Sequence, residues 1–435
     1  MPDTLWIRAE PATNLAWRLR RGAPHPHHGW VTIATTPVAR LRTLRSVVAG
    51  AFFVQGLLFI SLTLRLPQIK SLFDLSELAL SGLMLLLVLL AGAGSVGAEV
   101  LARHRDSAFA VRSALVLVTA GILLIGLALS GAGALPVLVA GMAVYGLGLG
   151  ANDAASNMQA VAVEHSVGRP MMPSFHAAWT AGGLLATLGA IALPDLRFGA
   201  ASVVLALFPL GLVFAPFLRR DHGTEAADPS DLGVPWRLIM LVGLGLVLFY
   251  TVDTAVTAWG PVYLSSDQVF TDPPTSPAMY ALATLPYLVA TLVARSAGDR
   301  ATARFGAPNV VRLGSVVAFV GLAIVVFAPA AVWQVGVVGF FVVGLGVAVV
   351  APLAFSAAAR VAGRDAPTDP AAHRARVDAV VARFNQFNYA GALLGAVLTG
   401  VVGTSTLRIG FAVPMVLVLG LLPLARHFAT VGAPE

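Results

Sequence analysis

The sequence contains no cysteine, a single lysine and few charged residues of any kind. Only 11% of its 435 residues are charged, against roughly a quarter in soluble domains. The absence of cysteine excludes a disulfide framework and a thiolate metal site. The scarcity of charge excludes a water-soluble fold, because 57% of the residues are hydrophobic and the mean hydropathy is +0.83. The chain must therefore use lipid as its solvent.

Twelve apolar runs follow one another along the chain, and each is long enough, at about 20 residues, to cross a bilayer as a helix. A β-barrel would instead show alternating segments of about ten residues. We therefore predict an all-α membrane protein with twelve transmembrane helices. The runs lie near residues 44–64, 77–102, 109–129, 135–160, 172–193, 198–219, 237–263, 276–298, 308–329, 333–358, 378–403 and 406–426.

The distribution of Lys and Arg predicts the orientation. With the N-terminus in the cytoplasm, 24 of the 28 Lys and Arg face the cytoplasm, including those of the segment 295–312, and four face outward. This positive-inside bias predicts that both termini lie in the cytoplasm. We expect the protein in the inner membrane of the cell. It also accounts for the net charge of +7, so we expect no nucleic-acid partner. Residues 1–43 lack the apolar core of a signal peptide and are expected to form a disordered cytoplasmic tail.

The chain repeats itself at an offset of about 200 residues. VRSALVLVTAG at 111–121 matches VRLGSVVAFVG at 311–321, and FHAAWTAGGLLA at 175–186 matches FNQFNYAGALLG at 384–395. Two parallel six-helix repeats around a site at the membrane midplane are typical of one large class of transporters. The predicted units are a first bundle over 44–219, a cytoplasmic linker over 220–236, a second, pseudo-symmetric bundle over 237–427 and a cytoplasmic tail over 428–435.

A loop motif makes the resemblance to a family specific. GDRATARFG at 298–306 resembles the loop that the major facilitator superfamily carries between helices 2 and 3 and repeats in its second half. The first-half copy, SVGAEVLARHR at 95–105, keeps Glu99 and Arg103 but lacks the usual glycine and Asp-Arg pair. The chain thus resembles this superfamily over about residues 44–427.

Further residues resemble one bacterial branch of the superfamily, related to the fucose permeases and to a poorly characterised group of inner-membrane proteins. The resemblance implies transport by alternating access between two bundles. The branch pattern falls on Arg65, Leu66, Pro67, Asp153, Asn157, Glu164, Gly168, Arg169, Pro170, Met172, Phe175, His176 and Ala177.

Four charged residues at the ends of spans are candidates for gates. Asp299 and Arg300 belong to the loop motif, where an acid can meet a helix N-terminus or an arginine of the other half. Glu99 is the acid of the first-half copy. Arg65, at the outer end of the first run, either closes a gate, binds substrate or extends its charge to the interface.

The fourth run carries the densest polar pattern, in GLGLGANDAASNMQ at 146–159. Its polar residues share one helical face or lie directly beside it. Because an unpaired polar group is costly in hydrocarbon, this face must contact protein or a water-filled cavity. Either the residues only join helices through hydrogen bonds, or Asp153 takes part in transport. The face and its neighbours comprise Tyr145, Gly148, Asn152, Asp153, Ser156, Asn157 and Gln159.

Other runs place polar and aromatic groups at matching depths. The fifth and eleventh runs, which are repeat copies, both carry such a face, and the first and seventh add a few more groups near mid-span. This symmetry favours a central site. The candidate substrate-binding residues are Gln55, Tyr145, Asn152, Asn157, Trp179, Tyr250, Asn385, Asn388 and Tyr389.

Candidate proton-coupling groups are Asp153, Asp253 and His176. The two aspartates are the deepest acids, and histidine titrates near neutral pH. No Lys or Arg is assigned to the middle of a span. The sequence therefore predicts a small neutral polar or cationic solute and disfavours an anion.

Taken together, these features predict a monomeric secondary transporter in the lipid bilayer, coupled to protons and without a cofactor or metal. The alternatives are a drug or metabolite efflux antiporter of the same fold and a sensor that does not transport. An enzyme is not expected, because no GxSxG or HExxH motif occurs. The absence of GxxxxGK[ST] indicates that ATP does not drive transport directly.

Overall fold

The structure is a computed structural model, and it describes residues 38–132, 135–167, 172–218, 235–364, 380 and 383–429. The predicted N-terminal tail up to residue 37, most of the predicted linker and the last six residues lie outside these ranges. The described residues form helices and connecting turns, and no strand occurs among them. The predicted all-α class is confirmed.

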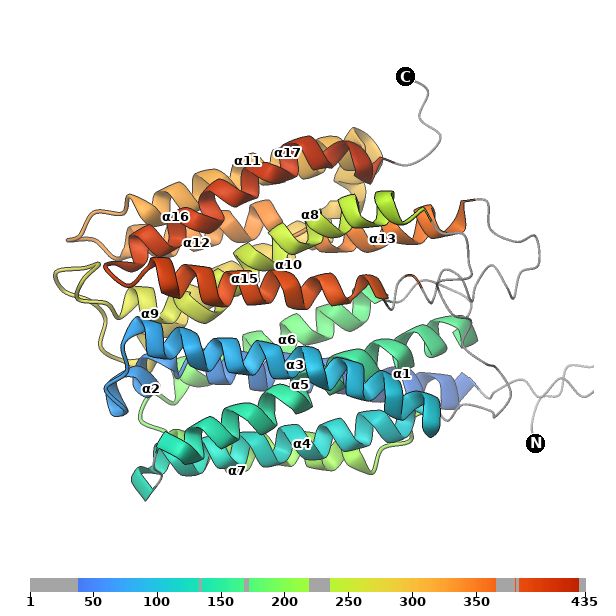
Figure 1. The fold of residues 1–435 in the computed structure, drawn as a ribbon, viewed down its shortest axis with the longest axis horizontal. Helices are drawn as coiled ribbons and strands as arrows, with labels where there is room; N and C mark the ends of the chain where they lie inside the picture. The colour runs from blue at the N-terminus through green and yellow to red at the C-terminus, as the bar shows by residue number, and fades with distance from the viewer. Residues whose placement is uncertain are drawn as a thin grey trace, which may run out of the picture. The chain divides into compact units, whose positions relative to one another are not determined.

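The first half of the chain forms the helices coloured blue to green in Figure 1. They begin where the sequence supplies a cap or an apolar run. Ser76 accepts a hydrogen bond from the backbone N–H of Ala79, and Asp106 accepts one from that of Phe109. The elements are α1 (Val38–Thr63), α2 (Leu66–Leu72), α3 (Glu77–His104), α4 (Ser107–Leu127), η1 (Ala128–Ala132), α5 (Leu135–Val167), α6 (Met172–Ala192) and α7 (Phe198–Val213).

The second half forms the helices coloured yellow-green to red, and several predicted runs are split into shorter elements. One such split lies at residues 348–349, between α12 and α13. The elements are α8 (Trp236–Thr254), η3 (Ala255–Trp259), α9 (Gly260–Leu264), α10 (Pro277–Phe305), α11 (Ala307–Val326), α12 (Gln334–Val347), α13 (Val350–Gly363), α15 (Gln386–Val402), α16 (Leu407–Leu417), η4 (Val418–Gly420), α17 (Leu421–Leu424) and η5 (Ala425–Phe428).

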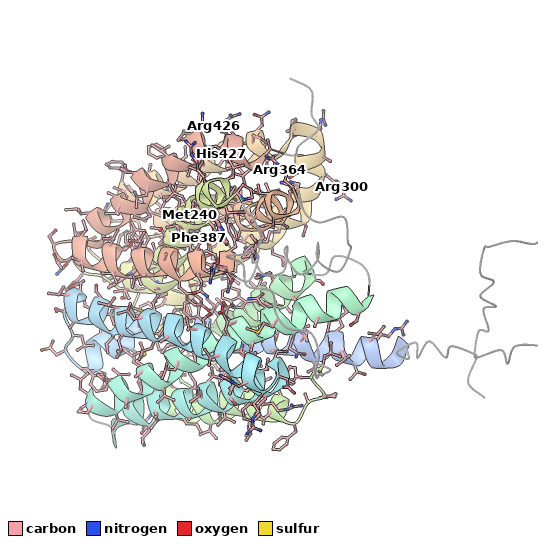
Figure 2. All side chains as sticks on the ribbon, turned by 45° about the vertical axis from the view of Figure 1, so that its right-hand side comes forward. Met240, Arg300, Arg364, Phe387, Arg426 and His427 are labelled. Atoms are coloured by element: carbon pink, nitrogen blue, oxygen red, sulfur yellow. The ribbon has the colours of Figure 1, made fainter. Side chains whose placement is uncertain are left out.

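The apolar helices account for the predicted spans. Ten stretches of the described chain are long and apolar enough to cross a membrane, and two shorter apolar helices, Phe198–Val213 and Gln386–Val402, fall on the sixth and eleventh predicted runs. The chain is therefore a multi-pass membrane protein. Figure 2 shows basic residues gathered at one end of the second-half helices, contributed by α10, η5 and the residue that follows α13; they are Arg300, Arg364, Arg426 and His427.

Two helix pairs join the halves. The red α15 lies beside the blue α3 in Figure 1, and α10 packs against α6. The two second-half helices thus each contact one first-half helix along the protein interior. Any polar group on the facing sides of these four helices lies between the halves, which is where an alternating-access site belongs.

Glycines bring α3 and α5 into backbone contact. A side-chain Cβ at Gly94 would collide with the carbonyl oxygen of Leu147, and one at Gly150 would collide with that of Ala91. Small residues allow helix backbones to approach closely in membranes, where apolar side chains gain little by leaving lipid. This packing holds α5, and with it the polar residues of 152–157, at a fixed position against α3.

The packing of α3 yields a stability prediction. Replacing Gly94 with Ala should lower the unfolding temperature of the detergent-solubilised protein, because overpacking costs about 1–3 kcal/mol or more. Gly92, on the same helix, has no atom within 4 Å of an added Cβ. Gly92→Ala should therefore leave the unfolding temperature unchanged or raise it slightly, since alanine favours helix. Equal effects of the two substitutions in a thermal unfolding assay would contradict this account of the helix pair.

Candidate functional site

Asp153 is the centre of a hydrogen-bond network between the two halves. Its Oδ2 accepts a hydrogen bond from the Tyr389 hydroxyl at 2.7 Å and from Asn385 Nδ2 at 3.0 Å, both on the second half. Its Oδ1 accepts one from Gln55 Nε2 at 3.2 Å, on α1. The side chain of Asn157 donates to the Asp153 backbone carbonyl at 3.0 Å and approaches Oδ1 at 3.5 Å. One carboxylate thus uses one oxygen for each half of the protein.

Further amides extend this network on both sides. Asn152 is buried and its Nδ2 reaches the Gln55 Oε1 and the Ala51 carbonyl, both at 3.4 Å. On α15, Asn388 donates to Asn385 Oδ1 at 2.6 Å, while its own Oδ1 is buried without a partner among the described residues. The predicted amides of the first, fourth and eleventh runs are therefore brought together around Asp153.

Not every polar residue of α5 belongs to this network. Gln159 Nε2 donates to the Ser107 hydroxyl and to the Leu218 carbonyl, both at 2.8 Å, so it joins elements of the first half only. Tyr145 is fully buried against the Gly121 backbone of α4, and its hydroxyl finds no partner in the described chain. The two alternatives for this helix thus apply to different residues: Gln159 joins helices, and Asp153 faces the other half.

His176 lies between aromatic rings of both halves. Its ring centroid is 5.4 Å from that of Phe52 on α1 and 6.5 Å from that of Phe355 on α13. One helical turn on, Trp179 packs beside Phe59, with ring centroids 6.4 Å apart. His176 and Trp179 are each half-buried. Their surroundings form an aromatic wall next to the network of Asp153.

Asp253 forms a second polar centre on α8. The Tyr287 hydroxyl of α10 donates to its Oδ1, and Tyr250, one turn earlier, stacks edge-on against Phe249. The π-helical segment η3 begins two residues after Asp253. Single π-turns inside helices are frequent at functional sites. The sequence predicted the two α8 residues but missed Tyr287, although it stands near the middle of the eighth run.

Arg295 corrects the charge assignment made from the sequence. It was counted with the cytoplasmic segment 295–312, but α10 continues through it and the apolar span Ala278–Gly298 includes it. Arg295 Nε donates to the Ala348 carbonyl at 3.0 Å, and Nη1 reaches the Thr180 hydroxyl of α6 at 3.4 Å. The count from the sequence thus assigned to the cytoplasm a basic residue that lies within the last turn of an apolar span and contacts the first half. The helical pattern of the sequence continues across residue 295, and this continuity could have placed Arg295 within the span.

The predicted gate residues do not form one cluster. Arg65 is buried at the far end of α1, where Nη2 reaches the Leu196 carbonyl at 3.4 Å and the guanidinium lies 5.6 Å from the Phe198 ring. These contacts stay within the first half. Glu99 is half-buried on α3, and Arg300 is exposed at the end of α10. The side chains of Asp299, Arg103 and Glu164, and residues 168–171, lie outside the described part of the chain.

Comparisons with known proteins agree with this geometry. No family model matches the chain. An uncharacterised transporter, y4wD, of Sinorhizobium fredii is 29% identical over 326 residues, covering 74% of this chain and 83% of the relative. An uncharacterised MFS-type transporter of Yersinia pestis is 26% identical over 381 residues, covering 86% and 93%.

Solved structures show the same fold at low sequence identity. The nucleoside transporter NupG superimposes with a TM-score of 0.63 at 15% identity, covering 88% of this chain and 98% of that one. FucP, a major facilitator superfamily transporter in its outward conformation, gives a TM-score of 0.60 at 14% identity, covering 89% and 98%.

The chain is similar in sequence to curated transporters, one of them of the MFS type, and it shares the fold of solved major facilitator superfamily transporters. Its curated relatives are transporters and not enzymes, in agreement with the expectation from the sequence. The resemblance predicted from the loop and branch motifs is thus confirmed at the level of the superfamily. In this fold the two halves move relative to each other around a central site, so the contacts of Asp153 across the halves are candidates for switching.

A conformational prediction follows from the donor on α15. Tyr389→Phe removes one hydrogen bond to a carboxylate, worth about 1.5–3 kcal/mol, and should shift the equilibrium of the two halves by about ten-fold or more toward separation at this end. Cysteines that replace His104 and Arg304, which are exposed near the ends of α3 and α10, can carry spin labels. The distance between the two labels then reports the separation of the halves.

The matched control is Tyr263→Phe. The Tyr263 hydroxyl donates to the Val325 carbonyl at 2.5 Å, entirely within the second half. Its loss should lower stability without lengthening the distance between the labels. If Tyr389→Phe leaves the distance distribution as in the wild type, the bond from α15 to Asp153 does not hold the halves together.

Proposed function

We propose that this protein is a proton-coupled secondary transporter that moves a small polar solute across the inner membrane by alternating access. The observation that carries the proposal is the double hydrogen bond from Asn385 and Tyr389 to a single carboxylate oxygen of Asp153. The bonds cross from one half to the other at a residue that can bind a proton. A proton on Asp153 therefore changes an interaction that alternating access has to break.

The chemistry of Oδ2 gives the direction of the effect. An ionised carboxylate only accepts hydrogen bonds, and Oδ2 has room for both donors. When Oδ2 is protonated it carries a hydrogen that needs an acceptor, and the hydrogen takes the place of one of the two donors. Asn385 Nδ2 and the Tyr389 hydroxyl cannot both remain in place. Deprotonated Asp153 therefore favours contact between the halves at this point, and protonation favours their separation.

The depth of Asp153 supports a position of this contact on the cytoplasmic side. With both termini in the cytoplasm, Asp153 lies about six residues, or about 9 Å, from the middle of its span toward the cytoplasm at 1.5 Å per residue. The contact then closes the cytoplasmic entrance while the outer side is open. A proton that enters from outside opens the entrance, and its release to the cytoplasm closes it again. This cycle imports solute together with protons.

The solute is proposed to bind in the region between the network of Asp153 and the pair Asp253–Tyr287. The amides near Asp153 and the rings of Trp179 and Tyr250 can bind polar groups and the carbon skeleton of a small solute. Asp253 is the second candidate for proton transfer, because it lies nearer to the middle of its apolar span than Asp153 does. His176 borders the same region from α6, between Phe52 and Phe355.

Asp153→Asn tests the proton role without knowledge of the solute. In the wild type the distance between labels at His104 and Arg304 should lengthen as the pH falls, because protonation removes a donor from Oδ2. The Asn variant resembles the protonated acid in shape and lacks charge. It should fold, give the longer distance at every pH, and lose the pH dependence. The distance distribution is measured between pH 5 and 9 in nanodiscs.

Asp253→Asn is the control for the assignment of the proton site. If Asp153 is the coupling residue, the Asp253 variant keeps the pH-dependent distance. In proteoliposomes with a pH gradient, a solute that the wild type accumulates should only equilibrate through the Asp153 variant. Wild-type accumulation by Asp153→Asn would show that its network is structural. Binding of the solute without any flux in the wild type would favour a sensor instead.

The orientation has its own test, which the absence of cysteine makes clean. A cysteine at Ala226, in the predicted linker, should react with a membrane-impermeant maleimide only after the cells are opened. A cysteine at Thr275, exposed in the turn between α9 and α10, should react in intact cells. The reverse pattern, or labelling of both from outside, would exclude cytoplasmic termini and the assignment of Asp153 to the cytoplasmic side.

A further inference from the structure

Arg295 is a cation inside an apolar span, and the network of Asp153 does not use it. It lies on α10 within the span Ala278–Gly298, about 10 Å from the middle of that span at 1.5 Å per residue. Charged residues within transmembrane segments are costly and are found facing a cavity, a partner or a substrate pathway. The guanidinium therefore needs an explanation in terms of what it binds.

The contacts of Arg295 position the side chain but do not neutralise it. The Ala348 carbonyl accepts from Nε, and it has no helical donor four residues on because residue 352 is a proline without a backbone N–H. The contact from Nη1 to the Thr180 hydroxyl is long, at 3.4 Å. Among the described residues no carboxylate pairs with Arg295, and Nη2 has no hydrogen bond. Nη2 is also not among the buried polar atoms left without a partner, so it retains accessible surface.

The two central acids of the described chain are bound to other groups. Asp153 accepts hydrogen bonds from both halves, and Asp253 accepts one from Tyr287 through Oδ1. Both acids, together with His176, are still close enough to interact electrostatically with one another or with Arg295. Arg295 thus lies beside the proposed solute region, and its Nη2 contacts no carboxylate of the described protein.

The polar side chains around Arg295 are surrounded by protein but are only partly buried. His176, Tyr250 and Asp253 all lie deep within the protein, and each keeps part of its surface accessible. The Tyr250 hydroxyl and Asp253 Oδ2 have no hydrogen bond among the described residues and are absent from the fully buried polar atoms. These side chains therefore place polar groups with unused hydrogen-bonding capacity near Arg295.

We propose that Arg295 binds a carboxylate group of the transported solute. This inference rests on the proposed function, because it places the solute in the space between the halves. A guanidinium matches a carboxylate through paired N–H donors, and in a site shielded from water the pair is strong. Asp253, which lies close enough to Arg295 to interact with it electrostatically, accepts a hydrogen bond from a hydroxyl or ammonium group of the same solute. The solute class is thus a small hydroxy acid or amino acid.

This inference reverses the substrate class expected from the sequence. That expectation disfavoured anions because only acids were assigned to the centre of the membrane. With Arg295 added, the centre can bind an anionic group at one position and a hydrogen-bond donor at another. A carboxylate also explains why the guanidinium is left without an acidic partner in the described protein: the partner arrives with each solute molecule and leaves with it.

The experiment uses matched solutes that differ only at the proposed contact. The probes are gluconate with gluconamide and serine with serinamide, tested by thermal stabilisation and by binding calorimetry on the purified full-length protein. In the wild type, one carboxylate should bind at least ten-fold more tightly than its carboxamide. Arg295→Gln should weaken binding of that carboxylate by about 10- to 100-fold, the effect of losing a hydrogen-bonded charge, and should leave the carboxamide unchanged.

Two further variants separate binding from a purely structural role. Arg295→Lys keeps the charge but not the paired geometry, so it should retain an intermediate preference for the carboxylate. Thr180→Val removes the contact between α10 and α6 and keeps the guanidinium. It should leave the preference unchanged. If Thr180→Val and Arg295→Gln weaken binding of both members of a pair equally, Arg295 only holds the two helices together.

The outcomes also distinguish this inference from the proposed function. Preference of the wild type for neither carboxylate, or for a carboxamide, overturns the role of Arg295 whether or not transport occurs. A carboxylate that binds through Arg295 but is not carried across proteoliposomes by the wild type contradicts the transport function and leaves the binding site in place. Flux of the carboxylate driven by a pH gradient in the wild type, with its loss in Arg295→Gln, supports both.

Discussion

A carboxylate enclosed in a membrane cannot rely on water, so every hydrogen bond that it needs must come from the protein. Asp153 obtains these bonds from α1 and its own helix on one side and from α15 on the other. Because the donors belong to different halves, this carboxylate joins the two halves. The other features of the centre, including the amides around Asn388 and the packing of α3, keep these donors within reach.

The close packing of α3 against α5 is what makes this arrangement precise. Gly94 and Gly150 each allow a backbone to touch the neighbouring helix without an intervening side chain. Since association of helices in lipid depends on fit rather than on hydrophobic burial, these glycines fix the rotation of α5. A change in rotation would turn Asp153 away from α15. Packing and polar chemistry therefore depend on each other along this helix.

Much of the fold could be predicted from the sequence, because the length and spacing of apolar runs reflect a property of single helices. The gathering of amides around Asp153 was also foreseeable in part. The repeated segments align Asn385 and Tyr389 with His176 and Thr180 of α6, so these residues lie at matching depths. The partners of individual side chains could not be predicted. Periodicity gives a face of a helix but not its neighbour, so Gln159 and Asp153 looked alike, and Tyr287 carried no distinguishing pattern.

The misplacement of Arg295 has a different physical origin, and it concerns the symmetry of the two halves. Aligning Gly97 with Gly298 places Gly94 opposite Arg295 in the repeats. In the first half this position allows α3 and α5 to touch, whereas in the second half the same position extends a guanidinium to the Ala348 carbonyl and the α6 hydroxyl. The pattern of apolar runs alone does not distinguish the two six-helix repeats. The structure makes them complementary: the first half supplies an acid that contacts the second half, and the second half supplies a base that contacts the first. In the proposed cycle a proton acts at Asp153 and a solute carboxylate at Arg295, so each acts on a different contact between the halves.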